Sequence, residues 1–203
     1  MDQLTKTIIF IPDLGEMPDA FTEVVNALPA GMGLKPRIAP WSGGEEEGQG
    51  TVEELLDKHE LRRVILVGSG RGAALALRIA QQQPRRITHL VLDTPAISLD
   101  DRGQKAGRVL KKIPGFLFRG RNKKELLTHV ADLSSSTARD FADVALPVLV
   151  LHGSQYQVPD ATELVSALPH AVAVSVDGAG LRTYRTHPAE FAHQLGQFLE
   201  NHS

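Results

Sequence analysis

The 203-residue chain has no cysteine, which excludes disulfide bonds and thiolate metal ligands. Its histidine, aspartate and glutamate residues show none of the spacings typical of metal sites. No apolar run approaches the roughly 20 residues of a membrane-spanning helix, and a net charge of -2 gives no general attraction to nucleic acid. With 42% hydrophobic residues, the chain suits one globular domain over residues 1–203. We expect a soluble, cytoplasmic protein that needs no metal or cofactor.

Six short runs are apolar at consecutive positions, as in strands that are buried on both faces of a parallel sheet. They cover residues 7–11, 36–39, 63–67, 87–92, 148–152 and 171–176. Amphipathic segments, typical of helices, lie between most of them at 20–28, 52–59, 72–83, 161–168 and 188–199. This alternation predicts an α/β fold with a mostly parallel, doubly wound sheet of about six strands.

The alternation stops between the fourth and fifth apolar runs. Helical patterns at 104–113 and 123–131 predict a short cap there, which we take as an insertion over residues 98–142. Basic residues crowd this cap, whereas acidic residues cluster at 45–60, before the third run. Solvated faces explain this segregation most simply. It also fits an acidic partner or an anionic membrane surface at the cap, or a homodimer in which the two regions pair.

Glycines stand at alternate positions where the third predicted strand meets the third predicted helix. The segment reads Gly68-Ser69-Gly70-Arg71-Gly72-Ala73. A strand, a tight turn and a helix are the layout of a nucleophile elbow, G-x-S-x-G, whose middle residue is the attacking serine. Here the middle residue is Gly70, which has no side chain that can attack. The pattern therefore predicts the scaffold of a hydrolase without its nucleophile.

Four motifs, in their order along the chain, resemble the α/β-hydrolase superfamily. They cover nearly the whole chain, at residues 11–15 with 21, 68–73, 146–153 with 158–159, and 177–180 with 187–191 and 198–199. The resemblance implies a serine, a histidine that takes its proton and a carboxylate that orients the histidine. The matching positions carry Gly70 for the serine, Gln155 or Tyr156 for the carboxylate and Leu181 for the histidine. All three roles are unfilled in the sequence.

The loop that resembles the family's oxyanion loop also departs from the pattern. Where the family shows His-Gly, this chain carries Pro12 and Asp13. Proline donates no backbone N–H, and a carboxylate at Asp13 would repel a developing oxyanion. We therefore expect the oxyanion hole to be lost as well.

Two other functions stay open on the sequence. Ser69, beside the apex, is the fallback nucleophile of an esterase or thioesterase with a rearranged site. The same glycine segment fits the dinucleotide fingerprint G-x-G-x-x-A through Gly68, Gly70 and Ala73. Asp93, about 20 residues further on, then stands where a ribose-binding carboxylate belongs.

The interpretation that fits most of these patterns is a catalytically inert α/β-hydrolase-like protein. It would bind a protein partner or an apolar small molecule, and not nucleic acid. Its expected binding cleft is lined by Pro12, Asp13, Gly70, Arg71, Tyr156 and Leu181. Without a catalytic serine and histidine, this cleft is expected to be a mostly apolar concavity.

Overall fold

The computed structural model describes residues 6–42, 44–97, 136–156 and 159–202. Most of the predicted cap, including both cap helices, lies outside the described residues. The basic residues at 102–124, on which the expected homodimer and membrane contacts depend, lie outside them too. Within the described ranges, no helix is both long and apolar enough to cross a membrane.

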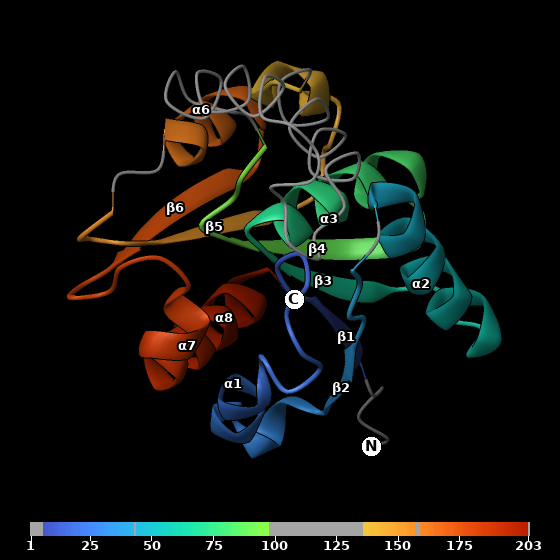
Figure 1. Cartoon of the computed structure of the whole chain (residues 1–203), viewed down its shortest axis with the longest axis horizontal. Coiled ribbons are helices and arrows are strands. Elements are labelled where there is room, and N and C mark those ends of the chain that lie inside the picture. The colour runs from blue at the N-terminus through green and yellow to red at the C-terminus, as the bar shows by residue number, and fades with distance from the viewer. Residues whose placement is uncertain (1–5, 43, 98–135, 157–158, 203) are drawn as a thin grey trace, which may run out of the picture.

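Six parallel strands form one twisted sheet in the order β2-β1-β3-β4-β5-β6 (Figure 1). This confirms the predicted α/β class and strand number. The strands are β1 (Lys6–Ile11), β2 (Leu34–Ile38), β3 (Val64–Ser69), β4 (Ile87–Asp93), β5 (Val148–Gly153) and β6 (Ala171–Val176).

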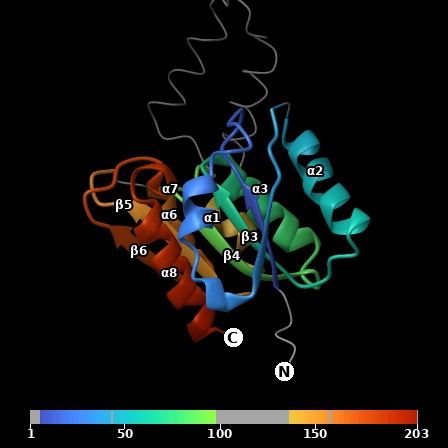
Figure 2. The ribbon, with the colours of Figure 1, turned by 90° about the horizontal axis from the view of Figure 1, so that it is seen from below.

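Helices cover both faces of the sheet, and Figure 2 shows α2 and α3 on one side with α1 and α8 on the other. One face packs against α2 (Glu45–Lys58), α3 (Arg71–Gln82) and α6 (Pro159–Ala167). The other packs against α1 (Thr22–Ala27), α7 (Thr183–Thr186) and α8 (Pro188–Asn201). Two short 3-10 helices, η1 (Ala30–Met32) and η3 (Ala138–Phe141), complete the described elements.

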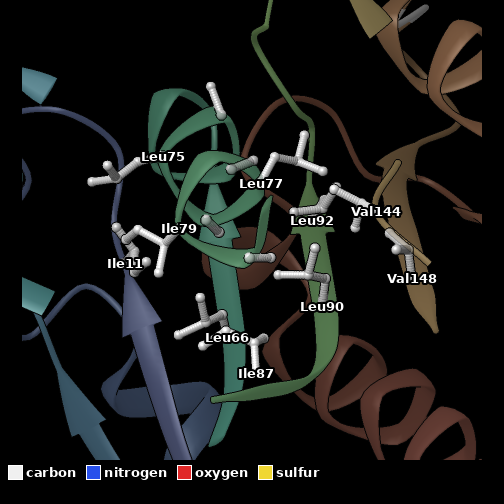
Figure 3. Packing of buried hydrophobic residues seen from close by; sticks show 14 of the residues in the cluster. Ile11, Leu66, Leu75, Leu77, Ile79, Ile87, Leu90, Leu92, Val144 and Val148 are labelled. Atoms are coloured by element: carbon white, nitrogen blue, oxygen red, sulfur yellow. The ribbon is translucent and has the colours of Figure 1, made fainter. Parts of the chain in front are cut away.

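Alternate residues of the central strands supply the two halves of the core. Ile9 of β1 joins the cluster under α3, whereas Ile8 joins the cluster under α8. Figure 3 shows Leu77 and Ile79 of α3 among apolar side chains of the sheet. Each such buried aliphatic side chain contributes about 1.5–3 kcal/mol. The continuous apolar runs in the sequence are therefore explained by burial on both faces.

The prediction that every strand is buried is wrong for the two edges of the sheet. In β2, Lys35 and Pro36 are exposed, and in β6 the exposed residues include Val172 and Ala173. Charged residues and proline are common on edge strands because one side of the strand has no ladder partner. β6 carries neither kind of residue, so its apolar sequence reads like that of a central strand.

The second predicted helix, at 52–59, is also too short, because α2 begins at Glu45. Three glutamates occupy its first turn, where the helix dipole favours negative charge. Gly48 and Gly50 lie within this turn and the next, and they hide the helical pattern in the sequence.

All six strands run in one direction, so the loops that follow them meet at the carboxyl edge of the sheet. In open α/β sheets, ligands bind at this edge. The predicted site residues lie on these loops or at the first turn of the helix that follows, apart from Gly68, Ser69 and Asp93, which lie at the ends of β3 and β4.

Candidate functional site

Gly70 forms the apex of a tight turn between β3 and α3. Its backbone has φ 55° and ψ -118°, a conformation that favours glycine. The turn is fixed to the end of β4, because the Gly70 N–H donates to the Asp93 carbonyl at 3.0 Å. The Gly70 carbonyl accepts from the Ala96 N–H at the same distance. The strand, turn and helix of a nucleophile elbow are therefore present, with glycine at the apex.

The glycines on either side of the apex are explained by close backbone packing. A Cβ atom at Gly68 would collide with the backbone of Gly72 and Ala73. A Cβ at Gly72 would collide with the carbonyl groups of Ile11 and Pro12. The glycine spacing that resembles a dinucleotide fingerprint thus lets α3 lie against β3 and the loop after β1.

The carboxylate of Asp13 occupies the space beside the apex. Its Oδ1 accepts hydrogen bonds from the Leu14 N–H at 2.9 Å and the Arg71 N–H at 3.0 Å. A Cβ atom added at Gly70 would lie 2.6 Å from Asp13 Cγ and 2.6 Å from its Oδ1. The Asp13 carboxylate thus fills the volume into which any side chain at position 70 would project.

Leu14 and Arg71 supply the two kinds of amide that form an oxyanion hole in an α/β-hydrolase. One follows the apex residue, and the other comes from the loop after an early strand. The missing N–H of Pro12 does not decide whether this loop offers a donor, because the amide of Leu14 points to the same place. The two amides converge on one oxygen, and that oxygen belongs to the protein's own Asp13.

The loop that carries Asp13 is held from two sides. The indole N–H of Trp41 donates to the Pro12 carbonyl at 2.9 Å, and the Gly15 N–H donates to the Trp41 carbonyl at 3.1 Å. Pro12 is buried, so it supports the loop and does not line a cleft.

Arg182, which the sequence analysis did not single out, provides the positive charge at the site. Its guanidinium lies 3.6 Å from Asp13 Oδ2 and 2.7 Å from Glu16 Oε1. Arg185 also pairs with Glu16. Arg182 directly follows Leu181, the position that resembles the family's histidine, but no local sequence pattern indicates its pairing with a loop 169 residues earlier.

A second polar cluster lies beneath the turn, around the buried carboxylate of Asp93. This group accepts hydrogen bonds from the hydroxyls of Thr183 at 2.5 Å, Ser69 at 3.0 Å and Thr94 at 3.4 Å. Asp93 has no exposed surface. Burial raises the pKa of Asp93 to about 6, although the hydrogen bonds from Thr183, Ser69 and Thr94 oppose this shift.

This cluster corrects two sequence interpretations. Ser69 is 1% exposed and donates its hydroxyl to Asp93, so it does not face the carboxyl edge as a fallback nucleophile would. Asp93 is completely buried and cannot contact a ribose in this conformation. The Arg71 amide, at the start of α3, donates to Asp13.

Tyr156 and Leu181 lie on the surface, 44% and 53% exposed. Their loops are joined, because the Gln155 N–H donates to the Ala179 carbonyl at 2.9 Å. The Arg71 N–H donates to Asp13 beside the apex, and the Arg71 guanidinium pairs with Glu45 at 3.1 Å.

The immediate surroundings of Gly70 are charged, contrary to the expected apolar concavity. Two surface cavities of about 580 and 680 Å³ are present, and neither is lined by Gly70, Tyr156 or Leu181.

Hydroxyl and imidazole groups meet at two places within the described segments. Thr88 lies 3.0 Å from His89, and Thr186 lies 3.0 Å from His187. Both pairs are adjacent in sequence, and neither includes Ser69. In these same segments, no group of three or more His, Cys, Asp or Glu side chains is arranged to hold a metal ion.

Comparison with known proteins places this geometry in a known fold. No family model matches the chain, and no curated protein matches its sequence. Solved structures match over almost its whole length. A hydrolase from Pseudomonas aeruginosa PA01 is 17% identical, with a TM-score of 0.74 over 96% of this chain and 90% of that one. NosK from Streptomyces actuosus is 19% identical, with a TM-score of 0.75 over 98% and 99%.

An enol-lactonase from Burkholderia xenovorans LB400 is 16% identical, with a TM-score of 0.72 over 97% of this chain and 92% of that one. At such identities, the likeness establishes the fold alone. The chain has an α/β-hydrolase-like fold with a six-stranded, all-parallel sheet.

The contact between Asp13 and Gly70 predicts that substitutions at the two positions are coupled. Gly70→Ala should lower the free energy of unfolding by about 2–4 kcal/mol, from backbone strain and from collision with the carboxylate. In an Asp13→Ala background only the strain remains, so the loss should be smaller by about 1–2 kcal/mol. Urea denaturation of the four proteins in this cycle measures the difference.

Gly178→Ala is the matched control for this cycle. Gly178 also has a positive φ, of 72°, but its Cβ would meet only His187 at an ordinary 3.6 Å. Gly178→Ala should lower the free energy of unfolding by the same amount whether residue 13 is aspartate or alanine. Equal costs of Gly70→Ala in the two backgrounds would contradict the proposed contact.

The raised pKa of Asp93 predicts a specific dependence of stability on pH. The folded protein holds this proton more tightly than the unfolded chain, whose value is near 3.8. Protonation therefore favours folding, and this stabilisation is lost as the pH rises through about 6. When the pH is lowered from 7 to 4, the free energy of unfolding of the wild-type protein should rise by on the order of 2–3 kcal/mol relative to that of Asp93→Asn.

Denaturant titrations of both proteins across this pH range measure that difference. Subtracting the Asp93→Asn curve removes the contribution of the other carboxylates. A difference that stays flat would show an unshifted Asp93 pKa, and one that falls as the pH falls would show a lowered pKa. Either result contradicts the prediction.

Proposed function

We propose that this protein does not hydrolyse esters and that it acts by binding an apolar ligand at the carboxyl edge of its sheet. The observation that carries the proposal is the carboxylate of Asp13 on the amides of Leu14 and Arg71, beside a glycine apex. A substrate's carbonyl oxygen would need these same two amides.

Acyl transfer needs a hydroxyl that can reach the substrate and a base that takes its proton. Gly70 offers no hydroxyl, and the hydroxyl of Ser69 is buried against Asp93. Leu181, where the resemblance would put the base, is an aliphatic side chain on the surface. These three facts support a site without acyl-transfer chemistry.

The exposed apolar side chains support the binding part of the proposal. Four large hydrophobic residues are exposed among the described residues, and Met17, Tyr156 and Leu181 are three of them. Each lies on a loop at the carboxyl edge, and hydrogen bonds and ion pairs join the three loops. Apolar side chains gathered at one exposed edge mark a binding surface more often than scattered ones do.

A fluorophosphonate probe, which reacts with activated hydroxyls, tests the absence of catalysis. The wild-type protein should not be labelled, and p-nitrophenyl butyrate should hydrolyse at the rate of buffer alone. Ser69→Ala and Thr186→Ala are the matched controls. The first removes the hydroxyl that is bonded to Asp93, and the second removes the hydroxyl that lies beside His187. Labelling that disappears in either variant would establish an active, rearranged esterase.

Restoring the catalytic side chains tests the role assigned to Asp13. The triple variant Gly70→Ser, Tyr156→Asp and Leu181→His should stay inactive, because Asp13 still holds both amides. Adding Asp13→Ala should raise esterase activity by about 10²–10³-fold over the triple variant, the usual value of oxyanion donors. Measured kcat values compare the two. Equal activities would show that Asp13 does not block the site.

A further inference from the structure

The group that fills the site beside Gly70 comes from a surface loop. Asp13 lies between β1 and α1, and about a quarter of its side chain is exposed. Its contacts are two amide hydrogen bonds and one ion pair at 3.6 Å. Groups from three separate parts of the chain, at Leu14, Arg71 and Arg182, therefore surround a single carboxylate that water can reach.

The loop has a second anchor that does not depend on Asp13. The side chain of Glu16 is 7% exposed and pairs with both Arg182 and Arg185. Arg182 lies closer to Glu16, at 2.7 Å, than to Asp13, at 3.6 Å. Asp13 can therefore leave the two amides while Glu16 keeps the loop in place and keeps Arg182 beside the apex.

The surface around this carboxylate is apolar at three points. Met17 follows Glu16, Leu181 precedes Arg182, and Tyr156 lies on the loop bonded to the one that carries Leu181. All three side chains are at least 44% exposed. Two amide donors and a guanidinium beside exposed apolar side chains match a ligand that has a carboxylate head and a hydrocarbon body.

We infer that Asp13 is an internal competitor at a carboxylate-binding site and that the external ligand is an apolar carboxylic acid. The ligand's carboxylate replaces that of Asp13 on the Leu14 and Arg71 amides, beside Arg182. Its hydrocarbon body lies against Met17, Tyr156 and Leu181. This inference rests on the proposed binding function and adds the chemical class of the ligand.

Dodecanoate, used below its micellar concentration, is the probe, and dodecanol is its uncharged counterpart. Binding is followed by isothermal titration and by the backbone amide NMR signals of Leu14 and Arg71. Asp13→Ala should bind dodecanoate about tenfold more tightly than the wild-type protein, as expected for one charge-assisted hydrogen bond made available. The NMR signals of both amides should shift when dodecanoate is added. The affinity for dodecanol should be the same in Asp13→Ala as in the wild-type protein.

Three further variants sharpen the test. Asp13→Asn keeps the volume but not the charge, so it should bind dodecanoate with an affinity between those of the wild-type and Asp13→Ala proteins. Asp19→Ala, on the same loop but exposed, should bind like the wild-type protein. Adding Arg182→Ala to Asp13→Ala should weaken dodecanoate binding by about threefold to tenfold.

The outcomes separate this inference from the proposed function. Equal gains for dodecanol and dodecanoate in Asp13→Ala, or unmoved Leu14 and Arg71 signals, overturn the carboxylate inference and leave the binding of apolar ligands standing. Absence of binding by either probe to any variant overturns both. The absence of catalysis is tested separately by the fluorophosphonate probe.

Discussion

The candidate site is organised by one contact, in which two backbone amides donate to the carboxylate of Asp13. The amides come from the loop after β1 and from the first turn of α3, so the contact joins segments 58 residues apart. It exists only because Gly70 leaves its side-chain volume empty. The two charge-assisted hydrogen bonds from these amides stabilise the folded protein.

Polar contacts continue from this point into the sheet. Thr183, at the start of α7, donates to buried Asp93 at the end of β4, and its neighbour Arg182 reaches Asp13 and Glu16. Asp93 therefore fixes the start of α7, and α7 in turn places the cation beside the apex. Two adjacent residues therefore connect the ion pairs at the surface with the buried cluster: Arg182 pairs with Asp13 and Glu16, and Thr183 bonds to Asp93. Asp93 thus has a structural role in this site, although it never reaches the surface.

Sequence patterns predicted the fold well because they are local. Continuous apolar runs identified all six strands, and the strand, glycine turn and helix around Gly70 identified the elbow. They could not show that β2 and β6 form the edges, because that depends on strand order. They also missed the start of α2 at Glu45, where glycines interrupt the helical pattern.

The candidate site was predicted less completely, for a physical reason. The sequence identifies Gly70 as an empty position, but it does not say what fills the space. Asp13 was read as a source of repulsion, and Arg182 was overlooked beside Leu181, because ion pairs between distant loops leave no periodic pattern. Gly68, Gly70 and Ala73 fit a dinucleotide fingerprint in the sequence, whereas in the structure close backbone packing accounts for the glycines at 68 and 72. Most of the cap lies outside the described residues and keeps its status as a prediction.

The shared volume at Gly70 and Asp13 also restricts how this protein can change by single mutations. Serine at position 70 introduces a side chain into space that the carboxylate already holds, so that step lowers the stability of the fold while aspartate remains at 13. The opposite order, with residue 13 shortened first, passes through a protein whose amides are merely solvated. Any evolutionary or directed path toward a side chain at the apex is therefore expected to begin in the loop after β1.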